Sequence, residues 1–309
     1  MKNTVTMVMI GSGCMDEYYE MDFVPELGEK VCCDFLGEKV GGMIGNAAAV
    51  AASYGMNTYL MDTVNGNEKA RQVLADFEKS GVNVNMVRYD PSLPDVKCLI
   101  FLKDGERIIY VIPTKKKNLV PDPEQERYLK EADYVYTTLG EMRCFLDPIG
   151  LVDMLRSCGV RLVLDVEYLD IPALEQEWEL IKKADVLFVN SEGNRQLKNK
   201  VGPAYRQELN TDCIVVLTEG DQGCSIYKGL ENYRIPAYRV TPVDTTGAGD
   251  TFNVSFLYGL SLEMSLKEAG EFANAAAARS ILFIGPRSGA VGETAVRKFM
   301  NQWKGEDEV

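Results

Sequence analysis

Apolar positions along the chain fall into short continuous runs that alternate with stretches of helical periodicity. The short runs are rich in Val, Ile, Leu and Tyr, which favours buried strands. They lie at residues 5–10, 58–61, 134–138, 162–165, 186–190 and 214–218. Helices are predicted at residues 46–54, 68–79, 148–158 and 172–183. Continuous apolar strands that alternate with helices indicate an α/β fold, in which a central, mostly parallel sheet is flanked by helices on both faces.

Two segments, residues 17–40 and 97–112, break this alternation. Each predicts antiparallel strands, and an Asp-Gly pair at 104–105 is typical of the hairpin turn in the second. We expect the two segments to form a small accessory sheet beside the main one. The pattern as a whole predicts a single domain over residues 1–304 and a frayed acidic tail at 305–309.

The charge balance and one missing residue type narrow the chemistry. The 309 residues include 33 Lys and Arg against 46 Asp and Glu, a formal net charge of −13. Because phosphate neutralisation needs clustered Lys and Arg, this balance argues against a nucleic-acid partner. The sequence contains no histidine, which excludes Ser-His-Asp and Cys-His catalysis and histidine-ligated metals. Acid–base chemistry near neutral pH must therefore fall to carboxylates, Lys, Tyr or Cys.

The cysteines and the N-terminal residues bear on the compartment. The sequence has eight cysteines, and none are spaced as C-x-x-C. Several lie in apolar runs, which is typical of buried thiols in a reducing cytosol rather than of a disulfide framework. Residues 5–10 are too short for the core of a signal peptide, and no apolar run approaches the roughly 18 residues of a membrane span. These patterns predict a soluble, cytoplasmic protein with no membrane partner.

The most specific feature is the loop Val243-Asp-Thr-Thr-Gly-Ala-Gly-Asp-Thr-Phe252, which an apolar stretch follows. Gly247 and Gly249 allow a tight turn and close approach to a ligand. A helix beginning near Ala248 would present unpaired N–H groups and the positive end of its dipole, which suits an anion. Asp250, in the first turn, could accept a proton from an attacking hydroxyl while those amides hold the developing phosphoryl charge.

Simpler interpretations of these glycines remain open at this level. Asp244 or Thr246 could cap an ordinary helix, with Asp250 only complementing the helix dipole. The Walker pattern G-x-x-x-x-G-K-[ST] does not occur in the sequence. A dinucleotide oxidoreductase is disfavoured, because Gly11-Ser-Gly13 lacks the third glycine of that fingerprint.

Two motifs together resemble the signatures of the PfkB (ribokinase-like) carbohydrate kinase family. Asp244-Thr-Thr-Gly-Ala-Gly-Asp250 is similar to the C-terminal signature, and Gly41-Gly-Met-Ile-Gly-Asn-Ala-Ala-Ala-Val-Ala-Ala-Ser-Tyr-Gly55 is similar to the N-terminal one. The resemblance extends over residues 5–289. It implies a ribokinase-like three-layer fold with a small β-sheet lid, formed by segments at about 14–40 and 95–113. It also implies ATP-dependent phosphorylation of a hydroxyl group on a sugar or sugar-like molecule.

The resemblance places four residues at the sugar. Asp16 is a carboxylate suited to paired hydroxyls, and an Asn amide can donate and accept at once. The four are Asp16, Gly42, Asn46 and Glu141, the last on a looser match for which a surface acid is the alternative. Cys14 stands where ribokinases proper often carry Asn, and Met43 replaces a Lys of some members. The change at Cys14 weakens the case for ribose, and the change at Met43 removes one polar contact.

The same resemblance implies a nucleotide side. Thr218, Gly220 and Gly223 match a T-x-G-x-x-G strand-turn that would line the phosphates and ribose of ATP. Asn274 matches a position beside the adenine, although an Asn on a helix face would look the same. Asn190 opens a motif that reads Asn-x-x-Glu in many members.

Two metal ions enter only through the resemblance. Mg²⁺ would bridge the β- and γ-phosphates of ATP. Gly193 stands in place of the usual acid of Asn-x-x-Glu, with Glu192 one residue early, so the usual magnesium network is incomplete. Asp244 and Thr246 match positions that hold a monovalent cation, K⁺, in many members. The remaining ligands would be backbone carbonyls near Ser280, Phe283 and Gly285.

The expected reaction has Asp250 as general base and the amides of Gly247, Ala248 and Gly249 around the phosphoryl oxygens. The substrate stays open between a sugar, a keto-deoxy sugar acid, a nucleoside and a phosphosugar. Arg107 and residues 115–117 could bind a phosphate, although a solvated surface is favoured for the lysine run. The rival interpretation is a catalytically impaired sugar- or nucleotide-binding regulator on the same fold. Exposed strand edges in the lid also predict a homodimer.

Overall fold

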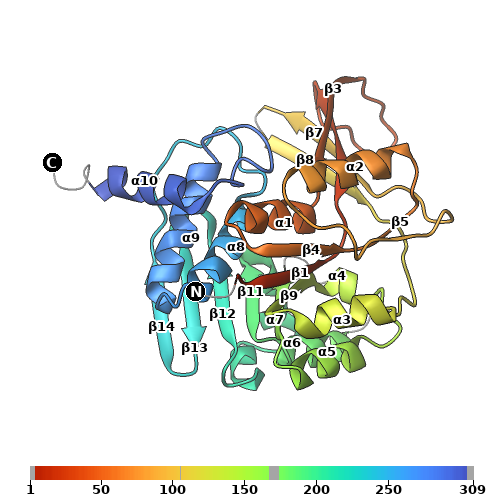
Figure 1. The fold of residues 1–309 in the computed structure, drawn as a ribbon. Helices are drawn as coiled ribbons and strands as arrows, with labels where there is room; N and C mark the ends of the chain where they lie inside the picture. The colour runs from red at the N-terminus through yellow and green to blue at the C-terminus, as the bar shows by residue number, and fades with distance from the viewer. Residues whose placement is uncertain (1–3, 105, 167–173, 305–309) are drawn as a thin grey trace.

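The structure is a computed structural model that describes residues 4–104, 106–166 and 174–304. Within them, an eight-stranded sheet has the order β14-β13-β12-β11-β10-β9-β1-β4 (Figure 1). All its neighbours from β12 to β4 are parallel, whereas β13 and β14 form an antiparallel edge. The strands are β1 (Thr6–Ile10), β4 (Asn57–Met61), β9 (Tyr134–Thr138), β10 (Arg161–Val166), β11 (Val186–Asn190), β12 (Ile214–Thr218), β13 (Cys224–Lys228) and β14 (Glu231–Ile235).

Helices cover both faces of this sheet. Side chains alternate along β1, so that Met7 and Met9 join one hydrophobic core while Val8 and Ile10 join the other. The first core is closed by α1 (Met43–Ser53), α2 (Glu68–Lys79), α8 (Ala248–Ser261), α9 (Leu266–Ser280) and α10 (Glu293–Lys304). The second is closed by α3 (Pro123–Glu131), α5 (Pro148–Ser157), α6 (Leu174–Lys182) and α7 (Ser191–Lys200). The expected layered α/β arrangement is confirmed.

The predicted elements agree closely with the observed ones, with one instructive difference. The strands at 134–138, 186–190 and 214–218 and the helix at 68–79 have the predicted bounds. Helix α1 begins at Met43, three residues before the predicted start. A Cβ atom on Gly45 would lie 2.5 Å from the Phe77 ring, so close helix packing requires a glycine that sequence alone disfavours in a helix. The predicted helical residues 172–173 and the acidic tail at 305–309 lie outside the described residues.

A second, four-stranded sheet, here called the small sheet, stands beside the ends of β1 and β4 (Figure 1). Its order is β3-β2-β7-β8, with β2 (Cys14–Met21), β3 (Cys33–Gly41), β7 (Lys97–Lys103) and β8 (Glu106–Ile112). The hairpins β2–β3 and β7–β8 are antiparallel as expected, but β2 pairs with β7 in parallel. A parallel pair needs a long crossover, which the chain between β3 and β7 supplies. Gly105 of the predicted turn is outside the described residues.

The remaining short elements complete the described chain. They are the strand pair β5 (Thr63–Val64) and β6 (Arg88–Tyr89), helix α4 (Leu139–Met142), and the 3₁₀ turns η1 (Tyr205–Glu208) and η2 (Gly220–Gln222). A search of the described helices finds no span with the length and apolarity that crossing a membrane requires. All eight cysteines are free thiols.

Candidate active site

The glycine loop ends in the conformation that starts helix α8. Gly247 is the N-cap residue with a left-handed φ of 77°, and a Cβ atom there would lie 2.0 Å from the Pro286 carbonyl oxygen. Only glycine fits this position without a backbone shift. The N–H groups of Ala248 and Gly249 belong to the first helical turn, where amides have no acceptor inside the helix. The Ala248 N–H donates to the Thr245 carbonyl of the loop at 3.3 Å. The loop therefore presents the start of the α8 dipole, as the sequence predicted.

Asp250 lies in that first turn, buried at 7% exposure. Asn46 of α1 donates from Nδ2 to Oδ2 of Asp250 at 2.9 Å, across 204 residues of chain. Asn46 Oδ1 is buried and has no hydrogen-bond partner among the described residues. Buried polar atoms normally form a hydrogen bond, so this oxygen is available to accept one from a hydroxyl group of a ligand. The structure thus joins a carboxylate and a vacant acceptor at the start of one helix.

Asp16, on β2, is a second buried carboxylate, at 5% exposure. Its Oδ1 accepts a hydrogen bond from the Cys14 thiol at 3.1 Å. Burial raises the pKa of Asp16, while the Cys14 hydrogen bond and the Arg287 guanidinium act in the opposite direction. A Cβ atom on Gly41 would lie 2.0 Å from Oδ2 of Asp16. The glycine pair that precedes α1 therefore makes room for this carboxylate.

The resemblance places Asp16 at the sugar. On that expectation, Gly41→Ala should raise the KM for the sugar by roughly 10–100-fold, because the added methyl group, 2.0 Å from Oδ2 of Asp16, would displace that carboxylate by about 1 Å. The matched control is Gly292→Ala, whose Cβ atom would lie 3.8 Å from the Ser53 carbonyl oxygen, an ordinary van der Waals contact. Steady-state kinetics on both variants makes the comparison. Equal KM values for the two variants would show that the Asp16 position is not set by Gly41.

The loop before α8 is clamped from two sides. Asp244 accepts the N–H groups of Thr246 and Gly285, each at 2.9 Å. Partial burial would raise the pKa of Asp244, but these N–H groups lower it overall. Arg107, from β8 of the small sheet, donates to the hydroxyl of Thr246 at 2.7 Å and to that of Thr245 at 3.3 Å. The small sheet therefore reaches the loop where the anion site was predicted.

A cavity of about 570 Å³ lies between the small sheet and this loop. Its lining includes Tyr18, Arg107, Asp244 and Thr246. The Tyr18 hydroxyl is buried without a partner among the residues described, and burial raises its pKa. The cavity volume falls within the roughly 300–1,000 Å³ typical of small-molecule sites. This is the space in which a substrate could meet the loop.

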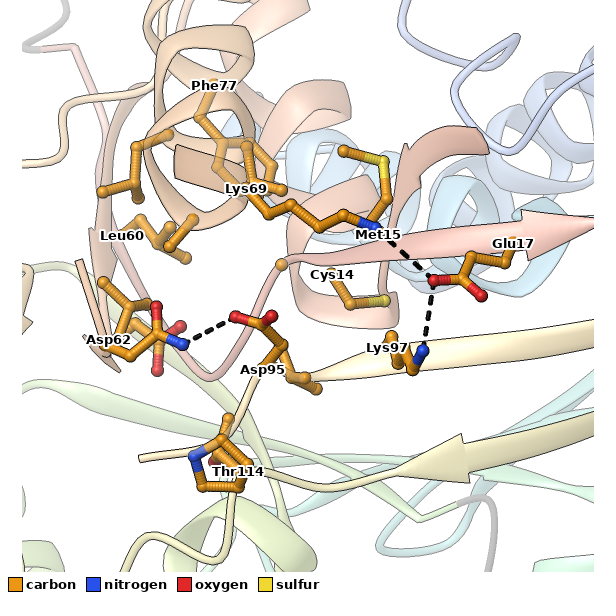
Figure 2. A pocket seen from close by; sticks show the side chains of 18 residues that line it. Cys14, Met15, Glu17, Leu60, Asp62, Lys69, Phe77, Asp95, Lys97 and Thr114 are labelled. Atoms are coloured by element: carbon orange, nitrogen blue, oxygen red, sulfur yellow. Dashed lines mark hydrogen bonds and ion pairs between the residues drawn. The ribbon is translucent and has the colours of Figure 1, made fainter. Parts of the chain in front are cut away.

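A smaller pocket lies at the base of the small sheet, against α2 (Figure 2). Figure 2 shows Lys69 and Lys97 both reaching Glu17, at 3.5 and 3.2 Å. Met15 and Glu17 line it and alternate along β2 with Asp16. Its volume of about 60 Å³ is far below that of a ligand site. Of the two, only the larger cavity has the size of a ligand site. It adjoins the loop at Asp244 and Thr246, but Asp16, Asn46 and Asp250 are not among its lining residues.

Glu141 lies close to the predicted site but is tied to a buried lysine. Lys116 Nζ contacts Glu141 Oε2 at 2.8 Å, Asp62 Oδ1 at 2.7 Å and Ser12 Oγ at 2.9 Å. The expectation of a solvated lysine run is wrong at its centre, since the Lys116 side chain is only 4% exposed. Lys115 and Lys117 are exposed as predicted. The three follow one another outside any helix or strand, with a left-handed φ of 58° at Lys115, and three identical residue types give no sign in the sequence of which one is buried.

The pfkB family carbohydrate kinase profile matches residues 8–291, which is nearly the whole chain. The chain belongs to this family. It is a sugar kinase with a ribokinase-like α/β fold, as the two signature motifs implied. The ribokinase of Bacillus subtilis is 26% identical over 294 residues, covering 95% of this chain and 98% of that protein. An ATP-dependent ribose-1-phosphate kinase of Halopiger xanaduensis is 25% identical, covering 96% of this chain and 99% of that protein.

Solved structures agree on the fold. The ribokinase of Arabidopsis thaliana, complexed with ribose and ATP, superposes with a TM-score of 0.82 at 22% identity, covering 96% of this kinase and 99% of that chain. The ribokinase of Thermotoga maritima gives a TM-score of 0.78, also at 22% identity and with the same two coverages. At these identities, the likeness concerns the fold alone.

The predicted nucleotide-side residues of the kinase lie together at one end of the main sheet. Asn190 and Thr218 are paired across β11 and β12. Gly220 and Gly223 have φ values of 58° and 93°, and a Cβ atom on Gly223 would lie 2.0 Å from a backbone oxygen of β14. Asn274 donates to the carbonyl of Ile235, the last residue of β14, and to that of Pro236, at 3.2 and 3.1 Å. Asn274 thus holds the backbone of this corner, a role that sequence reasoning missed.

The departure in the Asn-x-x-Glu motif has a structural cause. Asn190 caps α7 by accepting the Gly193 N–H at 2.8 Å, and a Cβ atom on Gly193 would lie 2.3 Å from the Val166 carbonyl oxygen. Glu192 does not replace the missing acid, because it is exposed and bonded to Arg195 of the same helix. Arg195 lowers the pKa of Glu192 to about 2. The residues at this position do not fit the family's magnesium network, and we derive no step through it.

Proposed function

We propose that this kinase transfers the γ-phosphoryl group of ATP to a hydroxyl of an unphosphorylated sugar or sugar-like molecule, with Asp250 as general base. One observation carries the proposal. The vacant acceptor Asn46 Oδ1 lies on the same side chain that holds the Asp250 carboxylate at the start of α8. A substrate hydroxyl that donates to Asn46 would stand beside both the base and the helix amides.

The reaction follows from these positions. The substrate hydroxyl oxygen forms a bond to the γ-phosphorus as the bond from that phosphorus to the β,γ-bridging oxygen breaks. The hydroxyl proton passes to Asp250, and ADP leaves. The amides of Gly247, Ala248 and Gly249 would donate hydrogen bonds to the transferred oxygens and stabilise their negative charge. Asp16 would accept other hydroxyls of the sugar, and Mg²⁺ brought with ATP would neutralise its phosphates.

Arg107 gives the small sheet a role as a lid. Its hydrogen bonds to the hydroxyls of Thr245 and Thr246 place a guanidinium beside the proposed phosphoryl position. A lid closed in this way excludes water and limits wasteful hydrolysis of ATP. Because Arg107 is engaged by this loop and Lys116 by two carboxylates, the described geometry favours a substrate without its own phosphate.

We also propose that a potassium ion binds beside the loop. Oxygen donors are available from the Asp244 carboxylate and the carbonyls of Ser280 and Gly285, and hard cations prefer such ligands. The Ser288 hydroxyl already bridges those two carbonyls, at 2.8 and 2.9 Å. The segment is thus held without an ion, and K⁺ would adjust the loop rather than create it.

A screen for ADP release tests the function. Pentoses, hexoses, sugar acids, nucleosides and phosphosugars are each supplied with Mg-ATP, in K⁺ and in Na⁺. We expect one unphosphorylated class to stimulate ADP release well above the background, and Na⁺ to lower that rate without abolishing it. Stimulation by phosphosugars alone would refute the assigned substrate class. No stimulation of ADP release by any compound tested would refute the kinase assignment of the site.

A second function, a sugar- or nucleotide-binding regulator without chemistry, is favoured by one observation. Gly193 replaces the acid of Asn-x-x-Glu, and the Glu192 carboxylate accepts a hydrogen bond from Arg195 instead. Tight sugar binding in calorimetry together with no ADP release in the screen would select this function. Sugar-dependent ADP release would dismiss it.

We also propose a homodimer through the small sheet. On the face opposite Asp16, four aromatic rings from its four strands follow one another, with centroids 5.3–5.7 Å apart: Phe35, Tyr19, Phe101 and Tyr110. Phe35 and Tyr110 are each 57% exposed, and an exposed apolar face of this kind suits a second copy. Light scattering should give twice the 34.4 kDa chain mass, and Tyr110→Glu should lower it. A monomeric mass at micromolar concentration would contradict the dimer.

A further inference from the structure

Three metal-ligating side chains gather at the base of the small sheet: Cys14, Asp16 and Cys98. Cys14 and Asp16 are two apart on β2, so their side chains share a face. Cys98 is the register partner of Asp16 on the parallel strand β7, which places it on the same face. One atom from each, two sulfurs and one carboxylate oxygen, lie within 4.8 Å of one another. Strand pairing therefore builds the cluster.

Two of the three distances between these atoms can be compared with a tetrahedral metal centre. The two sulfur atoms are 3.9 Å apart, close to the edge of about 3.8 Å that zinc–sulfur bonds of 2.3 Å give in a tetrahedron. Cys14 Sγ and Asp16 Oδ1 are 3.1 Å apart, whereas a tetrahedral centre needs roughly 3.5 Å. A movement of a few tenths of an ångström by the carboxylate closes that difference. The fourth position would be open to water, as in sites that exchange ligands.

The residues around the cluster restrict the positions of its side chains and offset part of their negative charge. Cys14 and Asp16 are 3% and 5% exposed, and a Cβ atom on Gly42 would lie 3.2 Å from Cys14 Sγ, so the backbone presses against the thiol. The Arg287 guanidinium acts electrostatically on both Cys14 and Asp16. Two thiolates and one carboxylate carry three negative charges. A divalent ion balances two of them, and Arg287, which is also paired with Asp76, partly offsets the third. The thiol protons pass to solvent when the ion binds.

We propose that Cys14, Asp16 and Cys98 form a binding site for a thiophilic divalent cation of the Zn²⁺ type, and that the ion inhibits the kinase. The inhibition rests on the proposed function, because Asp16 cannot hold the ion and accept sugar hydroxyls at once. The donor set selects the ion: thiolates favour Zn²⁺ and Cd²⁺ over Mg²⁺, which takes oxygen ligands. Ordinary Mg-ATP would therefore leave the site alone.

Direct metal binding tests the site without any kinase assay. The whole chain, reduced with a phosphine, is titrated with Cd²⁺ while the ultraviolet thiolate-to-metal absorption is recorded, and Zn²⁺ is titrated against a chromophoric chelator. The variants are Cys98→Ser and Cys14→Ser, with thermal unfolding to verify their folds. Cys33→Ser is the matched control, since Cys32 and Cys33 are a neighbouring pair outside the cluster.

We expect one tightly bound ion per chain, with thiolate absorption that the control variant retains. Each cluster variant should lose most of that absorption and bind at least about tenfold more weakly. No thiolate absorption in the wild type, an unchanged Cys98→Ser variant, or a loss in Cys33→Ser would each overturn the site. Finding a Cys14–Cys98 disulfide under the same reducing conditions, with no metal bound, would also overturn it.

Competition with substrate then separates this proposal from the function. With a sugar identified by the screen, Zn²⁺ should raise its KM in the wild type and much less in Cys98→Ser. Binding at the cluster without any kinase activity would leave the metal site standing and refute the proposed function. A KM for the sugar that is the same with and without bound Zn²⁺ would refute the inhibitory role.

Discussion

Replacing Asp250 with Asn is expected to lower kcat by about 10²–10⁴-fold, the usual contribution of a positioned general base. The substitution keeps the shape of the side chain and removes only its capacity to take a proton. Asn46 holds the carboxylate from α1 at 2.9 Å, so the variant should bind sugar and ATP with affinities within a few-fold of the wild type. Steady-state kinetics and calorimetric binding together separate the lost step from lost binding.

The matched control is Glu268→Gln. Glu268 is also an acid in the first turn of a helix, where it forms a capping box with Ser265 at the start of α9. If first-turn acids act only on the helix dipole, both variants should lose only a little stability and neither should lose kcat. A normal kcat in Asp250→Asn would remove Asp250 from the role of base.

Replacing Lys116 with Met is expected to destabilise the fold by about 3–5 kcal/mol, the cost of removing one partner from a buried ion pair. The side chains of Lys116 and Asp62 are 4% and 1% exposed, and Glu141 is the second acid on the same ammonium. Without Lys116, the Asp62 carboxylate would be buried with no opposing charge. Chemical denaturation of the variant and the wild type measures the loss.

The loss should depend on pH in a defined direction. Burial raises the pKa of Asp62 to about 6 even though Lys116 opposes the rise. Removing Lys116 raises that pKa further, so the folded variant binds a proton that the unfolded chain releases. Stability should therefore recover as the pH falls from neutral through about 6 and towards 4. Lys117→Met, on an exposed neighbour, should change stability by less than about 0.5 kcal/mol at any pH, and an equal effect in both variants would contradict the buried network.

Much of the fold could be predicted because local signals and tertiary packing agree. The first four residues of β11, Val186 to Val189, are all apolar because both faces of the strand are covered, and the polar Asn190 ends the run. Disagreement appears where distant contacts decide. Gly45 lies inside α1 because the Phe77 ring occupies the space that a side chain would need. The parallel pairing of β2 with β7 joins two hairpins that lie far apart in the sequence, so no local pattern predicts it.

The candidate site divides in the same way. The proposed anion site at the start of α8 could be argued from Gly247 and Gly249 alone, since glycine geometry and helix amides are local properties. The bond between Asn46 and Asp250 spans 204 residues, and only the family resemblance placed both at one site. Lys116 carried no signal, because its two neighbours are also lysines and burial depends on which one faces Asp62.

The most direct test of the account is to detect the product itself. The kinase, Mg-ATP and the sugar that stimulates ADP release are incubated, and mass spectrometry follows the sugar and its phosphorylated form alongside ADP. The account predicts one phosphorylated sugar for each ADP in the wild type, and a rate about 10²–10⁴-fold lower in Asp250→Asn. Sugar bound tightly without a phosphorylated form, or product made equally fast by Asp250→Asn, would contradict it.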